Sequence, residues 1–417
     1  MIKKIAISIF LFLLFYLDSI YLGPIKWAQL WKGCFILIMM GLWIFKKKKS
    51  AKVFTFYFYM VFFYFLTPFL FTNFNHILIK SIENLFFPST FLFLHYLTRN
   101  NHNYTAFLSF ISVFFIASFT PFYFNIIPEL GKTYDLELLG LTGQSGISGL
   151  FQQPHAASFV LAYSTLTLVY VIQKTRSKSL NAFLIFMIIL ATFFQLLTYA
   201  RLGLLMTLVG FIYMYAYQLN LVKMLKFSLI VIVGILISAS FIKETQSYES
   251  MKLRFYGQSK FSDNSTFSGE LNYNEISSGR LTIWSSSLEN VIHPNNVAEF
   301  LLGITELELT ERNEKKINLA VFSHNAFIDS LVTNGLIGFI IFILFLITWF
   351  KLILQIKLPN FKNSIDQKFC LTIFIIYLVS LFFQGGVIIY EGIFISFSLL
   401  LLFNKRNVML PKIRTYS

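Results

Sequence analysis

The sequence predicts an all-α protein: a polytopic transmembrane helical bundle of about 12 spans, with residues 1–417 forming a single integral membrane domain. Of these residues 56% are apolar and only 13% are charged, too few polar groups to cover a water-soluble surface. The apolar residues also gather into runs of about 20, the length of a helix that crosses a bilayer. The composition excludes disordered chains, nucleic-acid-binding modules and secreted disulfide scaffolds. Both cysteines, Cys34 and Cys370, lie in apolar runs, so we expect no disulfide.

The apolar runs place the expected helices in order along the chain. They cover residues 4–22, 27–45, 53–71, 77–97, 105–126, 157–173, 180–199, 202–219, 227–242, 332–350, 369–387 and 388–403. They do not alternate as the strands of a membrane barrel would. The first run follows Lys3 and Lys4 without a small-residue cleavage site after it, so we expect a retained signal anchor. An even number of spans puts both termini on the same side of the membrane.

The basic residues indicate which side that is. Segments that this order assigns to the cytoplasm carry 21 Lys and Arg and a single acid, Asp366. Residues 243–323 carry eight basic and eleven acidic residues. Because cytoplasmic loops are enriched in Lys and Arg, we expect cytoplasmic N- and C-termini, a first extracytoplasmic loop at 127–156 and a large one at 243–323 that contains short interfacial helices.

Four motifs lie at the predicted outer boundary of the membrane, and the first, GLFQQPHAA at 149–157, closes the first extracytoplasmic loop. Pro154 is a normal first residue of a helix, because its missing N–H is not needed there. The motif is then either a simple helix start or a site where free N–H groups, with Gln152 and His155, face an anionic headgroup or sugar.

The second motif, YARLG at 199–203, holds Arg201 in a tight turn between two spans. An arginine there can simply extend toward lipid phosphates. However, Arg201 is the only basic residue between Lys178 and Lys223, and the charge rule disfavours it on the outer face. We therefore expect its guanidinium to bind a phosphate or diphosphate.

The third motif, SSGRLTIW at 277–284, predicts a capped helix with an apolar face that includes Leu281, Trp284 and Leu288. Such a helix lies on the membrane surface. Arg280 and Trp284 are four residues apart and hence neighbours, so Trp284 can anchor the helix while Arg280 points toward a lipid-linked anion. The alternative is a solvated Arg280 at a helix start.

The fourth motif, FSHNAFID at 322–329, begins a helix after the large loop. His324 is either a structural residue at this helix start or a proton acceptor, because histidine is the side chain best suited to take a proton from a hydroxyl near neutral pH. Asn325 and Asp329 share a helix face. Asp329 either orients a partner or caps the helix locally.

In this order, the four motifs resemble the O-antigen polymerase and O-antigen ligase superfamily, bacterial polytopic membrane glycosyltransferases, over roughly residues 140–345. Two positions depart from the pattern: His155 stands where the family commonly has Asn, and ARLG at 200–203 stands where it often has SRGG. The resemblance implies a metal-independent enzyme of the bacterial inner membrane that needs no cofactor. Its donor is an undecaprenyl-diphosphate-linked oligosaccharide, and its partners are the lipid bilayer, a chain-length regulator and a flippase, with no nucleic acid.

The resemblance also implies roles for individual residues. The catalytic group comprises His324 as the base, with Arg201 and Arg280 as the diphosphate clamps. The substrate-binding group comprises Gln152, His155, Trp284, Asn325 and Asp329. No metal ligands are expected, since no Asp-rich or His-rich cluster has metal-ligand spacing.

Three functions remain open. A polymerase transfers the glycan to another lipid-linked repeat unit, and we favour it because polymerases are the most divergent members of the superfamily. A ligase transfers it to lipid A-core or to a protein hydroxyl. A flippase or exporter would need ionisable groups along a path through the bilayer, and acids in or beside the spans are few: Asp18, Glu83, Asp329 and Glu391.

Overall fold

The computed structural model describes residues 21–22, 25–45, 85–95, 104–127, 146–151, 154–198, 200–216, 280–317, 323–355, 364–383 and 391–409. In these residues the regular elements are helices, apart from a short antiparallel pair of strands, β1 (Tyr21–Leu22) and β2 (Ile25–Lys26). The prediction of an all-α fold is therefore confirmed. The structure differs at the end of the predicted span 4–22, where β1 forms.

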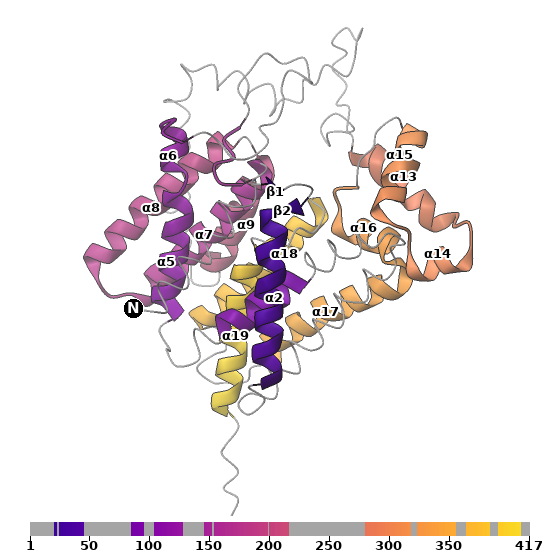
Figure 1. The fold of residues 1–417 in the computed structure, drawn as a ribbon. Helices are drawn as coiled ribbons and strands as arrows, with labels where there is room; N and C mark the ends of the chain where they lie inside the picture. The colour runs from indigo at the N-terminus through magenta and orange to yellow at the C-terminus, as the bar shows by residue number, and fades with distance from the viewer. Residues whose placement is uncertain are drawn as a thin grey trace, which may run out of the picture.

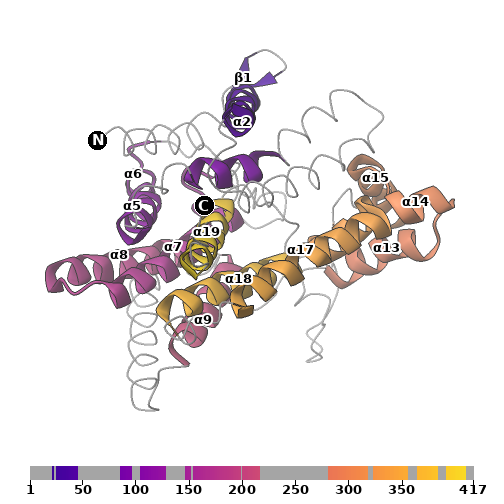
Figure 2. The same cartoon turned by 90° about the horizontal axis from the view of Figure 1, so that it is seen from below.

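The helices fall into two groups (Figure 1). The bundle contains α2 (Trp27–Phe45), a helix at Leu85–His95, α5 (Tyr104–Ala117), α6 (Thr120–Tyr123), α7 (Pro154–Lys174), α8 (Lys178–Leu197), α9 (Arg201–Ala216), α17 (Gly335–Gln355), α18 (Ile365–Phe383) and α19 (Glu391–Met409). The second group contains α13 (Arg280–Ile292), α14 (Val297–Leu302), α15 (Glu306–Ile317) and α16 (Ala326–Thr333). Figure 2 shows the second group gathered at one end of α17.

Five helical stretches among the described residues are long and apolar enough to cross a membrane: Thr105–Tyr123, Pro154–Lys174, Lys178–Leu197, Gly335–Leu354 and Ile365–Phe383. Each overlaps a predicted span. Four shorter apolar helices, Leu30–Leu42, Leu85–His95, Arg201–Met214 and Gly392–Leu402, overlap four more. The predicted spans 53–71 and 227–242 and most of 4–22 lie outside the described residues. The chain is a multi-pass membrane protein.

Two predicted spans have different boundaries in the structure. The stretch predicted as one span at 105–126 divides into α5 and α6, because Pro121 in the first turn of α6 cannot donate the hydrogen bond that would continue α5. The span predicted at 332–350 begins later, at Gly335, whose φ of 62° ends α16 and starts α17. Glycine tolerates this left-handed conformation because it has no Cβ.

Helix α7 occupies the centre of the bundle. It packs against α5, α8, α9, α18 and α19, and 83% of its membrane-length stretch is buried inside the protein, compared with 28% for α17. Its small residues and hydroxyls, such as Ser158 and Ala162, are buried with its larger apolar ones. Small residues let membrane helices approach closely, so α7 is the helix around which these five neighbours pack.

Polar contacts fix both ends of α7. At its last turn, Lys174 forms an ion pair of 2.7 Å with the buried Asp366 of α18, which also accepts a 2.7 Å hydrogen bond from the hydroxyl of Tyr170. At its first turns, the Ser158 hydroxyl donates to the carbonyl of Ala200, just before α9. The start of α7 and the start of α9 therefore lie at one end of the bundle, and the starting turn of α18 lies at the other.

Candidate functional site

Arg201 is the first residue of α9 and directly follows the short connection from α8. Thr198 shapes this turn: its hydroxyl donates to the carbonyl of Gln195 and accepts a hydrogen bond from the amide of Ala200. A Cβ on Gly203 would lie 1.8 Å from Oγ of Ser158, so only glycine lets α9 approach α7 here. The structure thus fixes the backbone that carries Arg201 against the start of α7.

A buried amide holds the three helices together just below this turn. The side chain of Gln195 in α8 donates to the carbonyl of Ser158 in α7 at 3.1 Å, and its oxygen lies 3.1 Å from the Thr207 hydroxyl of α9. Sequence analysis did not single out Gln195. The signal available in the sequence was an amide side chain within the predicted span 180–199, and the structure shows it to be fully buried, where a polar side chain needs partners.

His155 lies in the first turn of α7, which begins at Pro154 as the first motif predicted. Its side chain is partly buried. Because Ser158, three residues later, contacts the backbone just before Arg201, His155 and Arg201 are at the same end of the bundle. Gln152, the other candidate of this motif, lies outside the described residues.

His324 lies just before α16 and has an unusual backbone conformation. Its φ is 53°, in the left-handed region that residues other than glycine rarely adopt. Two neighbours define this short turn: Ser323, whose hydroxyl accepts from the amide of Asn325, and Asn325, whose side-chain oxygen accepts from the amides of Phe327 and Ile328 at the start of α16. Strained residues of this kind are concentrated at functional sites.

The turn is also tied to residues farther along the chain. Asp329 accepts hydrogen bonds from the amide and the hydroxyl of Ser323, at 3.0 and 2.6 Å. The indole of Trp284 in α13 donates to the carbonyl of Ser323 at 2.7 Å. Trp284, Asn325 and Asp329, predicted as substrate-binding residues, therefore make contacts within the protein that hold the backbone on both sides of His324.

Arg280 and His324 interact electrostatically. The surrounding protein atoms lower the pKa of His324 below its ordinary value, and the positive charge of Arg280, at the start of α13, lowers it further. Part of His324 remains exposed, so a substrate can reach it. A lowered pKa keeps the imidazole neutral at neutral pH and able to accept a proton.

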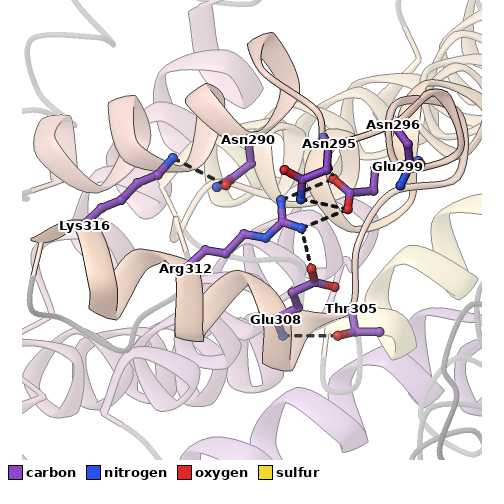
Figure 3. Close-up of polar contacts among 8 residues, drawn as sticks. All are labelled: Asn290, Asn295, Asn296, Glu299, Thr305, Glu308, Arg312 and Lys316. Atoms are coloured by element: carbon purple, nitrogen blue, oxygen red, sulfur yellow. Dashed lines mark hydrogen bonds and ion pairs between the residues drawn. The ribbon is translucent and has the colours of Figure 1, made fainter.

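Two other basic residues of the large loop are held by acids, as Figure 3 shows for the first. Arg312 of α15 forms ion pairs with Glu299 at 3.0 Å and with Glu308. Lys316 lies 3.2 Å from Glu289. These two ion-paired cations stabilise the packing of α13, α14 and α15.

The predicted site residues thus form two groups. Arg280, Trp284, His324, Asn325 and Asp329 come together where α13 packs against α16. His155 and Arg201 lie at the same end of the bundle, in the first turns of α7 and α9. Helix α18 neighbours both groups, since it packs against α9 and against α16.

This arrangement is that of a multi-pass membrane protein in which a neutral histidine that interacts with a cation lies just before the short helix α16, which leads into the membrane-length α17. Residues 185–343 match the family model described as O-antigen ligase. The match covers less than half of the chain, from within α8 to within α17, and includes Arg201, Arg280 and His324. It confirms the predicted likeness to the O-antigen polymerase and ligase superfamily. No curated protein matched the chain.

Proposed function

We propose that the protein is an O-antigen polymerase of the bacterial inner membrane. It transfers an undecaprenyl-diphosphate-linked oligosaccharide onto another lipid-linked repeat unit at the outer face of the membrane. The observation that carries this proposal is the strained, partly exposed His324 beside the cation of Arg280. A neutral base and a cation near the start of a spanning helix suit a donor whose reactive carbon adjoins a diphosphate at headgroup level.

In the proposed reaction, a hydroxyl of the acceptor sugar attacks the anomeric carbon of the donor. A bond forms between the acceptor oxygen and that carbon, and the bond from the carbon to the diphosphate oxygen breaks. The electron pair of the broken bond leaves with undecaprenyl diphosphate. His324 takes the proton of the attacking hydroxyl, while Arg280 and Arg201 stabilise the charge on the leaving diphosphate.

The remaining site residues support these groups. Trp284, Asn325 and Asp329 act through the turn that carries His324, since Nε1 of Trp284 and the Oδ1 atoms of Asn325 and Asp329 make hydrogen bonds within the protein. Gln152 and His155, which belong to the first motif, contact the glycan or the headgroup of the lipid that carries it. The flippase supplies the donor on the outer face, and the chain-length regulator ends the reaction.

The identity of the acceptor separates the two candidate functions. Divergence from the common family pattern at His155 and at residues 200–203 favours the polymerase. The description of the matching family model favours the second candidate, a ligase that transfers the same glycan to lipid A-core or to a protein hydroxyl. Both candidates use the same donor and the same leaving group.

Deletion of the gene in its native host distinguishes them by the surface polysaccharide seen on a gel. We expect core carrying a single repeat unit, because ligation continues when polymerisation stops. Bare core, with long glycan retained on the lipid carrier, would contradict the polymerase and support the ligase. A block in moving the lipid-linked precursor across the membrane would contradict both and support an exporter.

A further inference from the structure

Helix α14 carries an exposed apolar surface that its packing leaves uncovered. Val297 is 72% exposed, and Phe300, Leu301 and Leu302 are 37%, 36% and 45% exposed. Ile292, at the end of α13, is 66% exposed. Contiguous exposed apolar residues of this kind mark a surface that contacts a partner or a membrane. We call these five residues the α14 surface.

The backbone after α14 is fixed to the first residue of a spanning helix. A Cβ on Gly303 would lie 2.4 Å from the carbonyl carbon of Thr333, and one on Gly335 would lie 2.4 Å from the carbonyl oxygen of Leu301. The amide of Ile304 donates to the carbonyl of Val332 at 3.0 Å. Because Gly335 begins the membrane-length stretch of α17, α14 lies at the level where the chain enters the bilayer.

A polar contact fixes which side of α14 remains outward. Glu299 binds Arg312 of α15 and also accepts from the side chain of Asn295, as Figure 3 shows. This contact turns the Glu299 side of α14 toward α15. Val297, Phe300 and Leu301, at helical spacing on another side, stay outside the protein core.

The α14 surface also adjoins a surface that must face lipid. Along α17, Ile337, Ile340 and Leu344 are exposed, and α17 packs closely against α14. An apolar helix side beside the first turn of a lipid-facing span has the features of an element that lies in the membrane interface.

We propose that the α14 surface inserts into the lipid leaflet at which α17 begins and holds α13–α16 on the bilayer. The occupant of the surface is lipid, and neither a second protein nor a second copy of this chain covers it. The turn that carries His324 is then kept at headgroup level, because α16 joins α17 directly. This inference is independent of whether the chain is a polymerase or a ligase.

The test is the depth of spin labels on the full-length protein in phospholipid nanodiscs. Cys34 and Cys370 are first replaced by serine and alanine, and single cysteines are introduced by Val297→Cys and Phe300→Cys. Ile340→Cys serves as the lipid-facing control, and Glu314→Cys, on the exposed side of α15, as the aqueous control. The relaxation rate of each spin label is then measured with oxygen, which partitions into lipid, and with a nickel chelate, which stays in water.

We expect labels at 297 and 300 to relax faster with oxygen than with nickel, as at 340, and the reverse at 314. Strong nickel relaxation at 297 and 300 would place the α14 surface in water and overturn the proposal. Protection from both reagents would show that protein covers the surface, which also overturns it. The measurement needs no glycan transfer, so its failure is distinguishable from failure of the proposed function.

Discussion

At the scale of single residues, His324 combines backbone strain with an electrostatic partner. A left-handed conformation in a residue other than glycine costs about 1–3 kcal/mol, and histidine tolerates it better than most side chains do. The hydrogen bond that the Ser323 hydroxyl donates to Asp329 and the one that its carbonyl accepts from Trp284 offset this cost. A substitution at 324 can therefore affect the chemistry, the turn, or both.

The first prediction separates these effects. His324→Gln should lower the rate of glycan transfer by on the order of 10²-fold or more, since glutamine cannot accept the proton. Donor binding should survive, because the arginines hold the diphosphate. The transfer rate and the donor affinity are measured on purified variants with lipid-linked repeat units.

His324→Asn, which keeps a side chain tolerant of the left-handed conformation, should lose transfer without losing thermal stability. Near-normal turnover in His324→Gln would make the residue structural.

The second prediction concerns pH. Transfer needs neutral His324, so the rate should fall as the pH drops through the pKa of His324, which lies below its ordinary value of 6.5. Arg280→Gln removes a positive charge that lowers this pKa, so the pKa should rise and the acid limb of the profile should move to higher pH. The measurement is kcat/KM against pH.

Arg312→Gln is the matched control for this pH experiment. Arg312 is paired with Glu299 and Glu308, and the charge found to lower the pKa of His324 among the described residues is that of Arg280, so loss of Arg312 should leave the acid limb in place. An acid limb that does not move in Arg280→Gln would show that another group titrates, or that Arg280 does not act on His324.

At the scale of elements, the contact of α7 with α9 depends on one glycine. In Gly203→Ala the new Cβ would lie 1.8 Å from Oγ of Ser158 and 2.8 Å from its carbonyl oxygen. The helices must move apart, and overpacking of this kind costs about 1–3 kcal/mol. We expect a lower melting temperature in detergent.

Gly41→Ala in α2 is the control, because a Cβ there meets nothing within 4 Å. Alanine favours a helix over glycine by about 1 kcal/mol, so this variant should melt at the same temperature or higher. Equal melting temperatures for the two variants would contradict the close approach of α9 to α7.

The contact of α7 with α18 gives a fourth prediction. Asp366→Asn leaves Lys174 and Tyr170 without the carboxylate that both use. Breaking a buried ion pair costs about 3 kcal/mol, so the melting temperature should fall clearly. Glu289→Gln, which breaks the more exposed pair with Lys316, should cost less than about 1 kcal/mol. Similar losses in both would show that burial does not strengthen the α7–α18 contact.

At the scale of the whole molecule, nine of the twelve predicted spans overlap apolar helices of the described residues, because a span depends mainly on the length of an apolar run. The sequence also located Arg201 at a helix start and His324 just before one, since turn and cap residues act locally. It could not specify contacts between distant segments. The bond from Trp284 to Ser323 joins residues 39 apart, and the choice of Ser158 and Thr207 as partners of Gln195 depends on how α7, α8 and α9 pack.

The fifth prediction concerns the orientation of the whole chain. In a background without Cys34 and Cys370, Glu270→Cys should react with a membrane-impermeant thiol reagent from outside the inner membrane. Lys48→Cys and Ser417→Cys should react only after that membrane is permeabilised. The physical reason is the basic character of the segments that contain residues 48 and 417. Labelling of position 270 only after permeabilisation would invert the topology and place the proposed site on the wrong face.

The bond between Tyr170 and Asp366 has a consequence for biosynthesis. Its two residues are 196 positions apart, and a ribosome that adds about 5–20 residues per second needs about 10–40 s to cover that distance. During this interval the nascent α7 lies in the membrane without its carboxylate partner and without α18. The contact of α7 with α18 can therefore form only after residue 366 of the 417 has been synthesised, and the bundle closes late in translation.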